Sequence, residues 1–213
     1  MLQTHIAYQV EELAATGLDN IPLLWRRRSE QVVTILETHF ARSIPVVTLN
    51  LLGRKYFDDE VEALILLVKE LSSLSRSSQF HAKISVLGRW YDLPGRLVEE
   101  LKDLVTKTSQ YDEFFLNLCF AYDAQMEIVD SARAVGRAVR SGKIDPETIT
   151  EDVVREYLYA PHTPPPGVLV MTGNQECVRT FLFDAPTTKA LMTVKRFEEL
   201  TVDDLKKVEG QDL

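Results

Sequence analysis

One group of basic residues has the composition of an anion site. Arg26, Arg27 and Arg28 are consecutive, and Arg54 and Lys55 come shortly after a predicted strand. Guanidinium groups donate paired hydrogen bonds to phosphate oxygens, so these side chains could bind a phosphorylated ligand together. The alternative is a solvated basic patch, whose long side chains lie along the surface of an acidic protein. The sequence leaves both interpretations open.

A second candidate is the turn at Thr172, Gly173 and Asn174, which follows a predicted strand. Backbone N–H groups in such a turn can point at an anion. A plain turn explains the same residues, since Gly and Asn adopt turn conformations readily. The turn is therefore a candidate anion site with a simpler alternative.

The histidines and cysteines do not have the spacing of metal ligands. They are His5, His39, His81, His162, Cys119 and Cys177. They are scattered along the chain, and neither a CxxC pair nor a nearby His–Cys pair occurs among them. We therefore expect no zinc site and no disulfide. We expect structural or surface histidines and two buried free thiols, because Cys packs as a small apolar residue.

Helical and strand-like periodicities alternate along the chain, which is typical of an α/β domain with crossover helices. Strands are predicted at residues 4–10, 45–52, 83–87, 114–121, 168–171 and 191–194. Amphipathic helices are predicted near residues 59–74, 97–105, 124–140 and 152–158. Several strands are apolar at successive positions, as expected of strands covered on both faces. We predict a single α/β domain over residues 1–213, with a mostly parallel sheet of about six strands, surrounding helices, and a short C-terminal helix and tail over 201–213.

Composition excludes several classes of function. The chain has 213 residues and a net charge of −8, and its longest basic run is the three arginines at 26–28, so DNA and RNA are not expected partners. No apolar stretch approaches the roughly 20 residues that span a bilayer, and the N-terminus lacks the pattern of a signal peptide. We expect a cytoplasmic protein.

Four segments resemble motifs of the cis-prenyltransferases, the family of undecaprenyl and dehydrodolichyl diphosphate synthases. Gly88-Arg89 with Leu93-Pro94 resembles "iGd…LP", and Leu116-Asn117-Leu118 with Ala121-Tyr122 and Glu127-Ile128 resembles "LNiAlnYGGR.EI". Val168 to Gly173 with Phe181-Leu182 resembles "DLvIRTGGE.RLSNFLLWQ", and Thr48-Leu49 with Glu60-Val61 resembles "LTLYAFSTENW…EEV". Together these segments cover about two thirds of the chain in the family's order. The resemblance implies the family's fold and a function in isoprenoid synthesis.

The resemblance also shows where the phosphate chemistry is missing. In the family, a "DGNGRW" loop after the first strand binds diphosphate through backbone amides and holds Mg²⁺ through its Asp. Here that loop corresponds to Glu11 and the residues up to Thr16, and both glycines are absent. Without them the backbone cannot approach a phosphate closely, although Glu11 could in principle replace the Asp as a magnesium ligand.

Arginines that the family directs at its substrate are replaced as well. The substituted family positions are Gln125, Met171, Gln175, Cys177, Arg179 and Thr180. Gln125, Met171 and Cys177 stand in place of arginines. Since each charge-assisted hydrogen bond is worth about 1.5 to 3 kcal/mol, these losses amount to roughly three to six decades of affinity.

The resemblance therefore implies a non-catalytic subunit of a heteromeric cis-prenyltransferase that makes long-chain cis-polyprenyl diphosphate for a glycosyl carrier lipid. Such a chain has no cofactor of its own, and Mg²⁺ belongs to the catalytic partner subunit. Family members pair through the region near the chain's end, here from Phe181 to Phe197, where we expect a wide apolar surface. The lipid product would place the complex peripherally at the membrane.

Two alternatives remain open. The first is a divergent prenyltransferase that is active alone and uses Glu11 with the arginines at 26–28. The second is a polyprenyl-phosphate-binding protein that does no chemistry. The predicted helix at 59–74 corresponds to the family's element that lines an apolar tunnel for isoprenoid chains, but ordinary core packing explains the same leucines.

Overall fold

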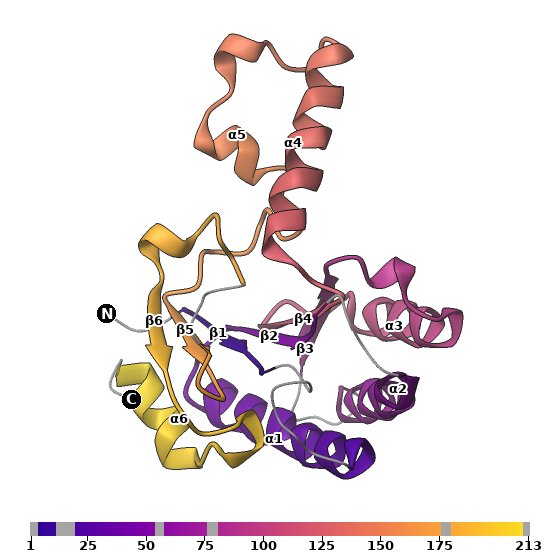
Figure 1. Ribbon diagram of the computed structural model, residues 1–213, viewed down its shortest axis with the longest axis vertical. Coiled ribbons are helices and arrows are strands. Elements are labelled where there is room, and N and C mark those ends of the chain that lie inside the picture. The colour runs from indigo at the N-terminus through magenta and orange to yellow at the C-terminus, as the bar shows by residue number, and fades with distance from the viewer. Residues whose placement is uncertain (1–3, 12–19, 54–57, 76–80, 176–179, 211–213) are drawn as a thin grey trace.

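The structure, a computed structural model, describes residues 4–11, 20–53, 58–75, 81–175 and 180–210. Within them lies a parallel sheet in the order β3-β4-β2-β1-β5-β6 (Figure 1). Its strands are β1 (His5–Gln9), β2 (Val46–Leu52), β3 (Ala82–Leu87), β4 (Phe114–Phe120), β5 (Val168–Met171) and β6 (Lys189–Met192). The predicted α/β fold with a parallel sheet is confirmed. The last strand lies earlier in the chain than the predicted 191–194.

The helices follow the apolar periodicity of the sequence closely. They are α1 (Ile21–Ala41), α2 (Asp58–Leu74), α3 (Gly95–Thr108), α4 (Ala124–Arg140), α5 (Glu151–Arg155) and α6 (Val202–Gly210), with short 3₁₀ turns η2 (Trp90–Asp92), η3 (Pro146–Thr148), η4 (Ala185–Thr187) and η5 (Phe197–Glu199). Side-chain caps fix two helix starts: Asn20 accepts from the Leu23 N–H, and Asp123 accepts from the Met126 N–H. In Figure 1, α4 and α5 extend away from the sheet. Within the described ranges, no helix is both long and apolar enough to cross a membrane.

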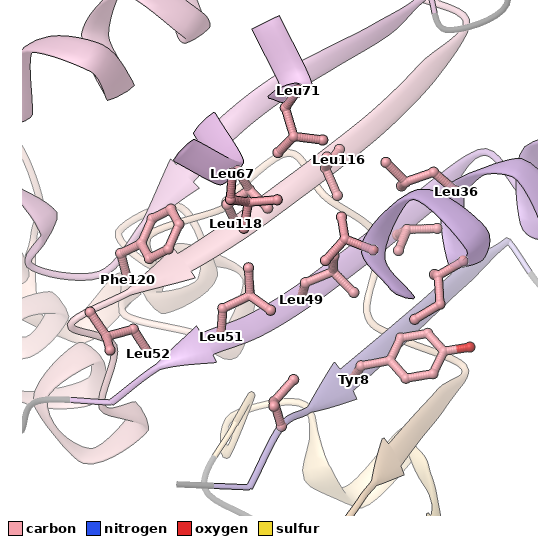
Figure 2. Packing of buried hydrophobic residues seen from close by; sticks show 14 of the residues in the cluster. Tyr8, Leu36, Leu49, Leu51, Leu52, Leu67, Leu71, Leu116, Leu118 and Phe120 are labelled. Carbon is pink, nitrogen blue, oxygen red and sulfur yellow. The ribbon is translucent and has the colours of Figure 1, made fainter. Parts of the chain in front are cut away.

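The large hydrophobic core lies on one face of the sheet, between the strands and helices α1, α2, α3 and α6. Figure 2 shows Leu36 of α1 and Leu67 and Leu71 of α2 pointing toward Leu49 of β2 and Leu118 of β4. Because successive side chains of a strand alternate between faces, every second residue of β1, β2 and β4 enters this core. The core thus fixes which side chains are left for the opposite face.

The opposite face combines small apolar clusters with buried polar groups. Ala7, Leu169, Met171 and Phe181 form one cluster, and a second one surrounds Cys119. Cys119 is a buried free thiol, as expected, and burial raises its pKa. The polar side chains of this face must find partners inside the protein, because a buried polar group without a hydrogen bond is costly.

His5 is one of the fully buried polar groups. Its Nδ1 lies 2.7 Å from the carbonyl oxygen of Pro164, so Nδ1 must carry the proton and donate. Its Nε2 then accepts from the Thr48 hydroxyl at 2.8 Å, and Thr48 in turn accepts from the Asn117 amide at 3.0 Å. Burial lowers the pKa of His5 to about 4, which favours this neutral form.

This network predicts a pH-dependent stability. In the unfolded chain His5 has a pKa near 6.5, so protons favour unfolding between about pH 6.5 and about pH 4. We expect the unfolding free energy to fall as the pH is lowered through that range, and His5 should contribute up to about 3 kcal/mol of the loss. Urea unfolding of wild type and His5→Asn across this range measures it. The variant should retain a smaller slope, since burial also lowers the pKa of His39, and equal slopes would contradict the assignment.

Candidate functional site

The topology of the sheet marks one place where a ligand is expected. From β1 the chain crosses to β2 on one side, and from β5 it crosses to β6 on the other side, although β1 and β5 are neighbours. In open α/β sheets, ligands bind at the carboxyl ends of two strands whose connections diverge in this way. Glu11 follows β1, and Thr172 and Gly173 follow β5. The structure therefore brings together three residues that were picked out by sequence analysis.

The Glu11 carboxylate lies at this point of the sheet, and it accepts hydrogen bonds from several protein groups. Glu11 is 3% exposed. The Arg28 Nη2 donates to its Oε1 and to its main-chain oxygen, both at 3.0 Å. The Thr172 hydroxyl donates to Oε2 at 2.5 Å, and the Phe197 N–H lies 3.4 and 3.3 Å from the two oxygens. Both carboxylate oxygens are therefore engaged.

Arg28 is separated from the two arginines that precede it in the sequence. All three lie in α1, but Arg28 is 1% exposed, whereas Arg26 and Arg27 face solvent. Arg26 forms only an exposed ion pair with Glu30. Arg54 and Lys55 lie outside the described residues. The arginine run thus supplies one buried guanidinium, and helical periodicity is the reason, because residues one position apart face different directions.

A second carboxylate lies on the other side of Arg28. Glu198 Oε2 is 3.6 Å from Arg28 Nε, which is an ion-pair distance but longer than a hydrogen bond. Burial, more than any other cause, raises the pKa of Glu198, and the nearby Glu11 charge raises it further. The Arg28 guanidinium also lies 5.4 Å from the centre of the Trp25 ring. Sequence analysis missed Glu198 and Phe197, which lie far from Glu11 along the chain.

The turn after β5 does not direct its amides into the site. The Gly173 N–H donates to Lys195 O at 2.8 Å, and the Asn174 N–H donates to Thr193 O at 3.1 Å. Gly173 has a φ of +71°, and a Cβ placed on it would lie 2.7 Å from the Cβ of Glu11. A glycine is required there because the Glu11 side chain occupies the adjacent space.

Neutral polar side chains lie beside Glu11 at the carboxyl ends of the strands. Gln175 Nε2 donates to Gln9 O and to Thr172 O at 2.8 and 2.9 Å, and Gln9 Nε2 donates to Gln175 Oε1 at 2.7 Å. Thr180 connects this pair to Asn50 of β2 through hydrogen bonds of 3.2 and 2.7 Å. Gln9 and Asn50 were also missed by sequence analysis. The available signal was a polar residue near the end of each buried strand.

Two other predicted positions that the structure describes, Met171 and Gln125, are not part of this cluster. Met171 is buried in the apolar cluster with Phe181, and Gln125 is exposed at the start of α4. Cys177 and Arg179 lie outside the described residues. The expected apolar surface is corrected at both of its ends, because Phe181 and Phe197 are 8% and 0% exposed and belong to the core.

Glu11 does not fit the role of a magnesium ligand. Mg²⁺ requires near-octahedral oxygen ligands and usually retains several waters. Here both carboxylate oxygens already accept hydrogen bonds, and the adjacent Arg28 would repel a cation. Among the described residues, no cluster of three His, Cys, Asp or Glu side chains could hold a metal.

The leucines of α2 pack into the core. Leu64, Leu67 and Leu71 are at most 2% exposed, while Leu66 is 69% exposed. The cavity next to them has a volume of about 10 Å³, which is room for roughly one water. It is lined by Leu36, Leu71, Leu74, Ser75, Ala82, Ile84 and Leu116. Core packing therefore accounts for these residues in the part of the chain that is described.

Comparison with known proteins gives the family. A family model described as putative undecaprenyl diphosphate synthase matches residues 24–208. This chain belongs to that family. The cis-prenyltransferase resemblance inferred from the sequence motifs is confirmed as the family of this chain.

Relatives of known name agree with this assignment. A tritrans,polycis-undecaprenyl-diphosphate synthase (geranylgeranyl-diphosphate specific) of Thermococcus kodakarensis is 30% identical over 164 residues, covering 75% of this chain and 62% of the relative. The dehydrodolichyl diphosphate synthase complex subunit Dhdds of Mus musculus is 33% identical over 99 residues, covering 46% and 30%. The chain thus spans about three fifths of the length of its archaeal relatives.

Solved structures show the same fold. Lavandulyl diphosphate synthase from Lavandula x intermedia, in complex with dimethylallyl diphosphate, superimposes with a TM-score of 0.87 at 19% identity, covering 99% of this chain and 94% of that one. A probable undecaprenyl diphosphate synthase from Campylobacter jejuni superimposes with a TM-score of 0.76 at 18% identity, covering 98% and 94%. At such identities the likeness concerns the fold alone.

The buried ion pair leads to a stability prediction. Arg28→Ala should reduce the unfolding free energy by about 3 to 5 kcal/mol, because it leaves the buried Glu11 without its cation. Arg27→Ala, one residue away on the exposed side of α1, should change it by less than about 0.5 kcal/mol. Urea unfolding followed by circular dichroism gives both values. Similar small effects for the two variants would show that the pair is not a structural necessity.

Proposed function

We propose that this chain is the non-catalytic subunit of a heteromeric cis-prenyltransferase. It supports a catalytic partner subunit in the synthesis of long-chain cis-polyprenyl diphosphate, the precursor of a glycosyl carrier lipid. Its place is the cytoplasm, peripherally at the membrane that receives the product. The Mg²⁺ and the diphosphate substrates are bound by the partner.

The observation that supports this proposal is that the hydrogen-bond donors at the ends of β1 and β5 are already bound to Glu11. A substrate diphosphate needs donors that are free to turn toward it, but Arg28, Thr172 and the Phe197 N–H all donate to Glu11. A substrate would have to displace a buried carboxylate and break its ion pair. Glu11 also brings a negative charge to the place where negative phosphates would bind, which opposes their binding.

A role as a subunit is supported by one relative, since the mouse protein is by name a subunit of a complex. The surface of this chain offers a suitable contact on β6. Ala190, Met192 and Val194 alternate along the edge strand and its extension, and all three are exposed. Met192 is 64% and Val194 is 78% exposed. Exposed apolar residues gathered on a sheet edge are typical of a protein contact.

The register of the sheet shows how this strip arises. Ala190 and Met192 pair with Leu169 and Met171 of β5, so they lie on the sheet face that Phe181 covers. Phe181 packs on Leu169 and Met171, while Met192 remains exposed. We propose that the catalytic subunit covers the strip Ala190, Met192 and Val194, completing this apolar face. This strip replaces the wider surface predicted over 181–197.

The alternative function is a divergent prenyltransferase that is active alone. It is favoured by the names of the archaeal relatives, which are themselves called synthases. The two functions differ in where catalysis resides, and therefore in what the purified chain can do without a partner.

Incorporation of radiolabelled isopentenyl diphosphate distinguishes them. The chain alone should give no polyprenyl product, because its site is filled by Glu11, and the chain mixed with a catalytic family member from the same cell should exceed that member alone. Mass spectrometry of lipid extracted from the chain is the control for the carrier function. Turnover by the chain alone would establish the divergent synthase instead, and bound polyprenyl phosphate without a partner protein would establish a carrier.

The strip on β6 gives a separate prediction. Met192→Glu combined with Val194→Glu should weaken co-purification with the catalytic subunit by about tenfold or more, since each buried carboxylate would lose its hydration at the contact. Leu66→Glu adds the same charge at an equally exposed position on α2 and serves as the matched control. Equal recovery of the partner by all three proteins would place the contact elsewhere.

A further inference from the structure

Three donors converge on the Glu11 carboxylate from separate parts of the chain. They are the Arg28 guanidinium of α1, the Thr172 hydroxyl after β5 and the Phe197 N–H at the start of η5. One cation, one hydroxyl and one backbone amide form the kind of donor set that proteins use for phosphate oxygens. The donors also lie where an α/β sheet of this topology binds ligands.

A second observation is that two buried donors near Glu11 have no hydrogen-bond partner among the described residues, although one of them, Arg28 Nε, lies 3.6 Å from Glu198 Oε2. Arg28 is 1% exposed, yet its Nε has no hydrogen-bond partner among the described residues. The Nε1 of Trp25, whose ring lies beside the guanidinium, has none there either. Buried donors of this kind are uncommon, because an unsatisfied polar group costs about 1 to 3 kcal/mol. Glu11 alone does not saturate the site.

The Glu11 side chain takes the position that a bound anion would have, and it supplies a negative charge there. Its stem lies against Gly173, so closely that a Cβ on Gly173 would come within 2.7 Å of the Glu11 Cβ and 2.8 Å of its Cγ. Replacing Glu11 by Ala removes the carboxylate and the methylene next to it, and so frees the space between Gly173 and the three donors. The main-chain oxygen of Glu11 stays, so one hydrogen bond to Arg28 remains.

We propose that Glu11 is a built-in anion that occupies a phosphate-type oxyanion site made by Arg28, Thr172 and the Phe197 N–H. Removing its carboxylate opens the site to inorganic phosphate or diphosphate. The inference concerns the chain by itself, and it stands whether or not a catalytic partner exists. It explains how the donors at the carboxyl ends of β1 and β5 are used without a substrate.

One neighbouring charge opposes anion binding. Glu198 Oε2 lies 3.6 Å from Arg28 Nε and also has no hydrogen-bond partner among the residues described. With Glu11 absent, Glu198 competes for the guanidinium and repels a bound phosphate. A second substitution, Glu198→Gln, should therefore tighten phosphate binding to the Glu11→Ala variant by about tenfold, a single-charge effect.

Thermal unfolding tests the proposal in the full-length chain. Wild type, Glu11→Ala and Glu11→Ala with Glu198→Gln are heated in millimolar phosphate, diphosphate or chloride at equal ionic strength. Phosphate and diphosphate should raise the Tm of both variants above the chloride value, more so in the double variant, and leave wild type unchanged. The control is Glu11→Leu with Arg28→Met, which fills the site with apolar groups and corrects for general effects of the anions.

Every outcome bears on the proposal. A folded Glu11→Ala protein whose Tm is the same in phosphate and chloride would overturn it, and so would an equal rise in the apolar control. If Glu11→Ala is unfolded in chloride, phosphate or diphosphate should restore its circular dichroism spectrum. Failure of both anions to do so, while Glu11→Gln folds, would overturn the proposal, because the site would then require the shape and hydrogen bonds of the side chain and not an anion.

Discussion

The ion pair between Glu11 and Arg28 is the contact on which the arrangement of the site depends. It joins Glu11, two residues after β1, to α1, and through Thr172 and Phe197 it reaches the end of β5 and the segment after β6. Isolated charges do not enter a protein interior, because their desolvation costs several kcal/mol each. The pair is tolerated because the two charges face each other and hydrogen bonds engage both oxygens of the Glu11 carboxylate. Once formed, it holds the two diverging strand ends together.

Other buried polar side chains near the carboxyl ends of the strands are also paired with one another, and these are neutral. Gln9, Asn50, Gln175 and Thr180 bond to one another, and His5, Thr48 and Asn117 form a second network deeper along the strands. These side chains satisfy each other inside the protein, and the main apolar core stays on the opposite face. The sheet therefore has a face that provides stability and a face where relatives of the family could place chemistry. In this chain the described polar side chains of the second face form hydrogen bonds with one another.

The fold is shared with proteins of low sequence identity. A TM-score of 0.87 with 19% identity shows that the backbone arrangement of a diphosphate synthase is retained. The fold tolerates this drift because it depends on apolar periodicity and volume, which many sequences satisfy. A diphosphate site depends on a few side chains in fixed positions, and single substitutions at those positions change its chemistry.

The sequence by itself determined the parallel α/β fold, most of the strands and helices, and the family, but it did not predict α1. Runs of apolar residues predict buried parallel strands, and spacings of three and four predict α2 and α3, because these patterns are local properties of the backbone. The burial of Phe181 and Phe197 was not predictable, since apolar residues occur both in cores and at contacts. The roles of Arg28, Glu198 and Phe197 were decided only by the tertiary structure. They lie far from Glu11 along the chain, and only the crossover connections of the sheet bring their donors and charges to one point.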